Sequence, residues 1–326
     1  MTVSVRAAAV LLATLALVGC APTGDDSEFV ESTAQPVYPE LTTNPDILVL
    51  SDIEYGSVDG EALLLDVCLP PEVEPEGSQA GSAGDATAEV AATTTRAAIV
   101  AIHGGSWRRG DKADLDWRAV CQWLASEGYV AVSINYRLAP AATFPAQLDD
   151  VQTAVAWLRD PAQLATFEID PARIGVFGAS AGGNLAALAG ATGSGDLTQG
   201  TRVAAVATLS GVSDLRAVIL TGPEYTGDFA KAQLEYLGCP SFDGCETATG
   251  ASPVTQVDPT DPPFFVAHSV DEFIPISQSD DLVTALRDAG IETTYLTVEG
   301  TAHALRMLDD EMMRRVIEFF AATLVQ

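Results

Sequence analysis

A serine flanked by small residues is the part of this sequence best suited to covalent chemistry. Residues 178–182 read Gly-Ala-Ser-Ala-Gly, which places Ser180 in a G-x-S-x-G pattern. A predicted strand, residues 173–177, precedes the pattern, and a predicted helical run, residues 184–189, follows it. Between a buried strand and a helix, this pattern describes a sharp turn that lets the serine hydroxyl project from a sheet edge. We therefore take Ser180 as a candidate nucleophile, with a plain glycine turn as the alternative.

A serine hydroxyl needs a base to take its proton, and in this context the partners follow in the order serine, acid, histidine. The chain has three histidines, and His303 is the one that fits, on a loop after the last predicted strand. The other two fall outside that order or leave no room for the acid. For the acid we favour Asp271, a few residues beyond the predicted strand 264–267, with Glu272 as its rival. The acid would hold the imidazole tautomer and stabilise its charged form.

A second glycine-containing stretch, His-Gly-Gly-Ser-Trp at residues 103–107, follows the predicted strand 97–102. Small residues there allow backbone N–H groups to approach a substrate oxygen. We expect the oxyanion hole to consist of the N–H groups of Gly104, Gly105 and Ala181. We expect His103 to be a structural hydrogen-bonding residue, and Trp107 either to line the substrate pocket or to pack in the core.

The elements that must position these residues alternate as short apolar runs and longer amphipathic segments, which is typical of a parallel sheet built from βαβ units. The predicted strands are residues 62–69, 97–102, 129–135, 173–177, 203–209, 264–267 and 293–298. Helices are predicted to begin at Pro145 and at Ser277, the second ending before Gly290. The fold class is therefore α/β, with one catalytic domain over residues 48–326.

The first 20 residues have the order of an export signal, with Arg6, an apolar run at residues 7–18, and Gly19 before Cys20. The run is too short to span a membrane, which takes roughly 20 apolar residues. The segment resembles a bacterial lipoprotein signal peptide, in which Cys20 becomes a lipidated first residue. We expect an exported membrane lipoprotein facing the outside, with ordinary secretion as the alternative.

Two further segments are polar and lack periodicity. Residues 21–47 are predicted to be a flexible tether. Residues 71–96, rich in Ala, Gly, Ser, Thr and Glu, are predicted to be a low-complexity surface insertion. A functional lid is the alternative, although the segment has few large apolar residues to cover a pocket.

Four cysteines remain after Cys20, an even number in a chain expected to leave the reducing cytosol. We expect Cys239 and Cys245 to pair across a short loop. Whether Cys68 pairs with Cys121 depends on geometry that spacing does not fix. Neither pair has a two-residue spacing or a neighbouring histidine, so we expect no metal site.

The chain has 16 basic and 45 acidic residues, a formal net charge of −29. Such a charge is repelled by nucleic acid and by anionic membrane surfaces. We therefore expect no nucleic-acid partner and membrane contact only through the lipid anchor. The charge does not indicate the substrate, and nothing in the sequence indicates the oligomeric state.

Several motifs together carry a likeness to a known family. They are residues 103–107 with 110–112, residues 135–140 (N-Y-R-L-A-P), and residues 144–145, 170–174, 178–184 and 251–253. The chain resembles, over roughly residues 50–325, the α/β-hydrolases of the hormone-sensitive-lipase-like and the acetyl-xylan and feruloyl esterase-like (BD-FAE-like) groups. The resemblance implies an eight-stranded, mostly parallel sheet with helices on both faces, the triad Ser180, Asp271 and His303, and no cofactor.

Two departures from the family pattern are informative. Ala179 stands where many hormone-sensitive-lipase-like members carry aspartate, which favours the acetyl-xylan-esterase-like branch with little or no cap. The approach to Asp271, residues 268–270, is one residue shorter than usual. The expected activity is hydrolysis of short-chain acyl esters through an acyl-enzyme, with carbohydrate acetyl groups as one target. An amidase, formamidase or peptidase on the same fold and a catalytically silent binding module are the alternatives.

Overall fold

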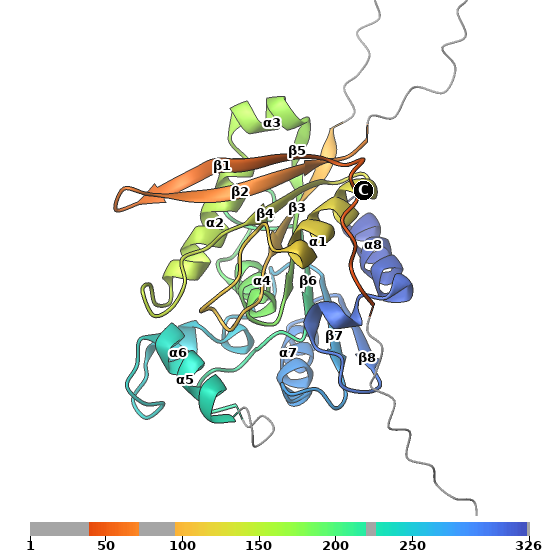
Figure 1. Ribbon diagram of the computed structural model, residues 1–326. Coiled ribbons are helices and arrows are strands. Elements are labelled where there is room, and N and C mark those ends of the chain that lie inside the picture. Colours follow the sequence, from red (N-terminus) through yellow and green to blue (C-terminus); the bar gives the residue numbers. More distant parts are fainter. Residues whose placement is uncertain (1–38, 72–94, 220–225, 325–326) are drawn as a thin grey trace, which may run out of the picture. The chain divides into compact units, whose positions relative to one another are not determined.

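The computed structural model describes residues 39–71, 95–219 and 226–324 (Figure 1). The predicted signal with Cys20, the predicted tether up to residue 38, and residues 72–94 of the predicted insertion lie outside the described residues. No helix within the described residues is long and apolar enough to span a membrane.

The fold is built on one eight-stranded sheet with the strand order β1-β2-β4-β3-β5-β6-β7-β8. The strands are β1 (Leu48–Val58), β2 (Glu61–Leu69), β3 (Arg96–Ile102), β4 (Val130–Ile134), β5 (Ile169–Ala179), β6 (Ala205–Leu209), β7 (Phe264–Ser269) and β8 (Thr293–Val298). Only the pairs β1/β2 and β2/β4 are antiparallel. The order and direction of the strands confirm the predicted α/β-hydrolase architecture.

Helices cover both faces of this sheet (Figure 1). They are α1 (Leu115–Ser126), α2 (Ala146–Leu158), α3 (Pro161–Phe167), α4 (Ala181–Ala191), α5 (Thr226–Leu237), α6 (Thr247–Gly250), α7 (Ser277–Asp288) and α8 (Asp310–Leu324). Side chains of β3 alternate between two cores, since Val100 packs with α2 and α4 while Ile99 packs with α1 and α8. The central strands β4, β3, β6 and β7 are therefore almost entirely buried on both faces, as their apolar sequences predict.

The amino-terminal boundary of the domain differs from the prediction. Asn44 and Gln122 of α1 exchange two hydrogen bonds, of 2.9 and 2.8 Å, and Ile47 is buried. The end of the predicted tether therefore packs on the domain. Residues 39–47 contain no helix, so this part of the chain supplies no helical cap. The strand β1 was not predicted, because Tyr55 alone of its eleven residues is buried and no apolar alternation marks it.

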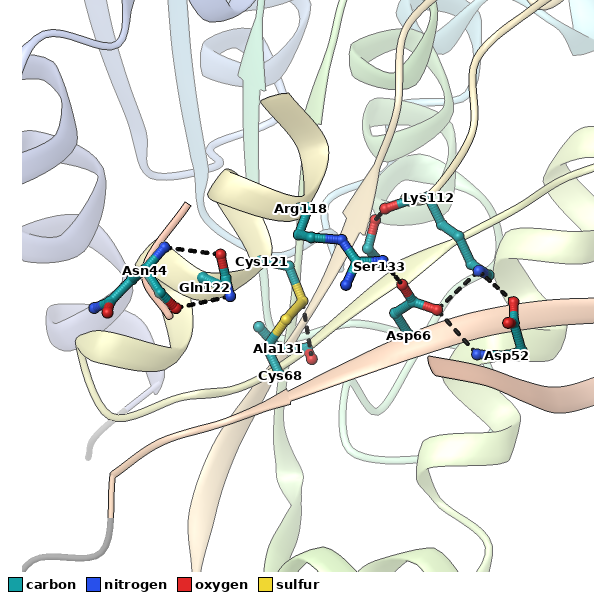
Figure 2. Close-up of a disulfide and its surroundings, with 10 residues drawn as sticks. All are labelled: Asn44, Asp52, Asp66, Cys68, Lys112, Arg118, Cys121, Gln122, Ala131 and Ser133. Atoms are coloured by element: carbon teal, nitrogen blue, oxygen red, sulfur yellow. Dashed lines mark hydrogen bonds and ion pairs between the residues drawn. A yellow bond between two sulfur atoms is a disulfide. The ribbon is translucent and has the colours of Figure 1, made fainter. Parts of the chain in front are cut away.

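Two disulfides join the four described cysteines. Cys68 of β2 is bonded to Cys121 of α1, 53 residues apart in sequence, and Cys239 is bonded to Cys245, six residues apart. Figure 2 shows the first bridge fastening α1 to the sheet. It is buried at both ends, whereas the second closes a small loop after α5.

The two bridges are expected to differ in their contribution to stability. A disulfide restricts the unfolded chain more when it closes a longer loop. Replacing Cys68 and Cys121 together by alanine should lower the free energy of unfolding by about 4 kcal/mol, and replacing Cys239 and Cys245 by about 2 kcal/mol. Urea denaturation of the two double variants measures both values. Equal losses of unfolding free energy would contradict a contribution that depends on loop length.

Candidate active site

Ser180 lies in the turn between β5 and α4, with φ 57° and ψ −122°. Its backbone N–H donates to the carbonyl of Leu209 at 2.9 Å. The turn requires glycine on either side, because a Cβ on Gly178 would lie 2.1 Å from the Gly182 oxygen and one on Gly182 would lie 2.0 Å from the Ile102 oxygen. A positive φ at a non-glycine residue is strained, and such strain concentrates at functional sites.

His303 lies on the loop that follows β8, and neighbouring strand ends hold that loop in place. The hydroxyl of Ser269 donates to the carbonyl of Ala302 at 2.5 Å, and the N–H of Ala304 donates to the Ser210 hydroxyl at 2.9 Å. The His303 side chain is partly exposed, while its Nδ1 makes a short hydrogen bond to the Glu272 Oε2. That bond directs the other ring nitrogen, Nε2, away from the acid.

The structure corrects the predicted acid from Asp271 to Glu272. The side chain of Glu272 is fully buried against His303, whereas Asp271 is exposed and its backbone N–H donates to the Gly300 carbonyl at 2.9 Å. Adjacent residues in this turn point in different directions, and position along the loop does not reveal which carboxylate points inward. With Glu272 as the acid, the segment between β7 and the acid is one residue longer. Its length then agrees with the family pattern, from which the segment before Asp271 departed.

Gly104 and Gly105 follow β3 and lie beside the nucleophile turn. A Cβ on Gly104 would stand 3.0 Å from the Ala179 oxygen and 3.3 Å from the Cβ of Ser180. Ala181 is the first residue of α4, where a helix leaves its N–H groups without intrahelical acceptors. Gly104 and Ala181 therefore lie against Ser180, and Gly105 lines the same cavity as Ser180.

A buried ion pair anchors the far end of the loop that carries Gly104. The Lys112 ammonium lies 2.8 Å from both Asp66 of β2 and Asp52 of β1, and the Ser133 hydroxyl donates to the Lys112 carbonyl at 3.0 Å (Figure 2). Burial disfavours the charged form of Lys112, but its hydrogen bonds to the two carboxylates outweigh burial and raise its pKa. The loop is thereby fixed to the antiparallel side of the sheet.

His103 and Trp107 in the same loop are structural. Burial lowers the pKa of His103, whose ring stacks on Tyr136 with ring centres 4.3 Å apart. Trp107 is fully buried, stacks on Tyr236 at 4.4 Å, and donates from Nε1 to the Asn184 Oδ1 at 3.2 Å. Of the two alternatives predicted for Trp107, core packing is the one that the structure shows, because the polar end of the indole finds its partner inside the protein. The prediction that Trp107 lines the substrate pocket is wrong.

A cavity of about 410 Å³ joins the reacting groups, with Gly104, Gly105, Ser180 and His303 in its wall. Trp117 and Phe273 supply aromatic surface, and the Phe273 ring meets the His303 ring edge to face at 4.6 Å. Four charged residues also line the wall, namely Arg109, Asp114, Asp116 and Arg306. None of these six was predicted from the sequence, because they become neighbours only when three separate segments of the chain meet. Within the described residues, no group of three or more metal-ligating side chains is arranged to hold a metal ion.

The known proteins that this chain resembles include several named esterases. Esterase LipQ of Mycobacterium tuberculosis is 32% identical over 278 residues, which cover 82% of this chain and 60% of LipQ. Among solved structures, a truncated form of a carbohydrate esterase from gut microbiota is 23% identical with a TM-score of 0.69, over 87% of this chain and all of that one (100%). A bifunctional GH43-CE protein of Bacteroides eggerthii is 26% identical with a TM-score of 0.64, over 85% of this chain and 35% of that one.

The chain thus spans about 60% of the length of the relative LipQ. The profile of one family, BD-FAE, matches residues 86–286, which is more than half of the chain and includes the nucleophile turn, the oxyanion loop and the acid. The chain therefore belongs to the BD-FAE family.

Proposed function

We propose that the protein is a serine carboxylesterase that hydrolyses short-chain acyl esters through an acyl-enzyme. The observation that carries this proposal is the convergence of Ser180, the His303–Glu272 hydrogen bond and the Gly104 loop on one cavity. The name of the relative esterase LipQ supports hydrolysis of an ester.

In the proposed reaction His303 takes the hydroxyl proton as the Ser180 Oγ attacks the ester carbonyl carbon. The backbone N–H groups of Gly104, Gly105 and Ala181 hold the negative charge that develops on the carbonyl oxygen. His303 then gives its proton to the departing alcohol, and a water activated by the same imidazole releases the acid. Glu272 keeps the Nδ1–H of His303 in place and stabilises the ring while it is charged.

An ester and an amide of the same acid distinguish an esterase from an amidase. The rates of hydrolysis of an ethyl ester and of the N-ethyl amide of the same short acid should be compared as kcat/KM. We expect faster ester turnover, with kcat/KM falling as the acyl chain lengthens from acetyl to octanoyl. Faster turnover of the amide would reject the esterase assignment.

A carbohydrate acetyl ester is the favoured natural substrate within this proposal. The cavity wall combines Trp117 with charged side chains of both signs, which suit the hydroxyl groups of a sugar better than a long apolar alcohol. The similar solved structure described as a carbohydrate esterase also supports a carbohydrate ester as the substrate. Acetylated xylose should therefore show a higher kcat/KM than butyl acetate, and the reverse order would contradict the preference.

We also propose that the protein is exported and anchored through a lipidated Cys20, on the strength of residues 1–20. Wild type should require detergent for release from the membrane fraction, and Cys20→Ala should be released by buffer alone. Release of the wild-type protein without detergent would favour ordinary secretion.

A further inference from the structure

A second histidine, which the proposed reaction does not use, contacts the acid. His268 of β7 is fully buried, and its Nε2 lies 3.0 Å from the Glu272 Oε1 and 2.9 Å from the carbonyl of Ile274. Its Nδ1 lies 2.7 Å from the Ser279 hydroxyl in α7. The side chains of His268 and Ser279 are absent from the wall of the active-site cavity. Any effect of His268 on the reaction must therefore pass through Glu272.

The surroundings of His268 fix its tautomer. Both groups against Nε2 are acceptors, a carboxylate oxygen and a carbonyl oxygen, so Nε2 carries a hydrogen. In the neutral ring, Nδ1 then accepts a hydrogen bond from the Ser279 hydroxyl. Ser279 thereby keeps the hydrogen of His268 on Nε2, the nitrogen that faces both the Ile274 carbonyl and the acid.

The buried carboxylate of Glu272 needs a hydrogen-bond donor at its second oxygen. Its side chain is fully buried, and its Oε2 is occupied by His303. Among the described residues, its Oε1 has no hydrogen bond of regular geometry. The Nε2–H of His268 points mainly at the Ile274 carbonyl, but Nε2 also lies 3.0 Å from this Oε1. One N–H shared between two acceptors is a common arrangement. A buried carboxylate without such contact is costly.

We propose that His268 is a positioning residue, which holds the free oxygen of Glu272 so that the other oxygen stays aligned with the Nδ1 of His303. Glutamate has one more rotatable bond than aspartate, so contact at one oxygen alone leaves its carboxylate plane less well fixed. This inference rests on the proposed function, because it assigns His268 to the same triad. It predicts an effect on kcat with little effect on KM, since His268 does not line the substrate cavity.

Two variants of similar shape test the role. His268→Gln keeps an N–H donor near the position of Nε2, and His268→Met has no donor. We expect His268→Met to lower kcat about 100-fold, the scale of a small misplacement in the catalytic geometry, with KM changed less than about twofold. His268→Gln should recover most of that loss. Equal losses in the two variants, or a wild-type kcat in His268→Met, would overturn the proposal.

A double variant shows whether the effect passes through Glu272. If it does, adding His268→Met to Glu272→Gln should lower kcat little further, whereas independent effects would multiply. Should His268→Met fail to fold by circular dichroism, Ser279→Ala decides instead: a lower kcat at unchanged KM supports the role, and a wild-type kcat rejects it. Activity that depends on Ser180 but not on His268 would reject only the positioning role, whereas activity retained in Ser180→Ala would reject the proposed function itself.

Discussion

Replacing Ser180 by alanine is expected to lower kcat for a short-chain ester at least about 10,000-fold. The variant keeps the cavity and the backbone N–H donors but loses the only hydroxyl placed in the strained turn between β5 and α4. Residual rate should remain above that in water, because binding and the oxyanion hole still act. The loss of kcat is measured from initial rates on p-nitrophenyl acetate, with the enzyme concentration determined from its absorbance.

Ser126→Ala is the matched control for this experiment. Ser126 is exposed at the end of α1, where its hydroxyl donates to the Trp123 carbonyl at 2.7 Å. The control should keep kcat within about twofold of wild type, as surface substitutions usually have small effects. If Ser180→Ala loses no more activity than Ser126→Ala, Ser180 is not the nucleophile.

Replacing Glu272 by glutamine is expected to lower kcat about 1,000- to 10,000-fold. Glutamine keeps the size of the side chain but removes the charge that stabilises the protonated His303, and its NH₂ group can face Nδ1 and favour the wrong tautomer. KM should change much less, because Glu272 is not part of the cavity wall. Steady-state kinetics on the same ester measure both constants.

Asp271→Asn is the control that tests the choice of acid. It makes the same chemical change one residue earlier, on an exposed side chain. We expect it to keep kcat within about twofold, in line with most surface substitutions. A larger loss in Asp271→Asn than in Glu272→Gln would return the acid to the residue favoured by sequence position and contradict the observed hydrogen bond.

The fold and the nucleophile could be predicted because their signals are local. Six of the seven predicted strands are apolar runs that the structure largely buries, and the seventh is the half-buried edge strand β8. The Ser180 turn follows from small residues between a strand and a helix. The edge strand β1 could not be predicted in this way, because its residues are largely exposed and its position depends on pairing with β2.

The acid and the pocket depend on information that is not local. Asp271 and Glu272 are neighbours in sequence, and only the path of the turn after β7 decides which carboxylate meets His303. Trp107 follows the oxyanion glycines, yet its ring turns into the core toward Tyr236 of α5, more than a hundred residues later in the chain. The contact of His268 with Glu272 likewise becomes visible only when the side chains are placed.

Covalent trapping is the most direct test of a Ser180 nucleophile. The protein should be treated with diethyl p-nitrophenyl phosphate, which transfers a diethylphosphoryl group to an activated serine as p-nitrophenolate leaves, and then examined by intact mass and peptide mass spectrometry. We expect one diethylphosphoryl group per chain, located on Ser180, with loss of esterase activity in proportion to labelling. Full inactivation with the group on another residue, or full labelling of Ser180 with activity retained, would contradict the proposed mechanism.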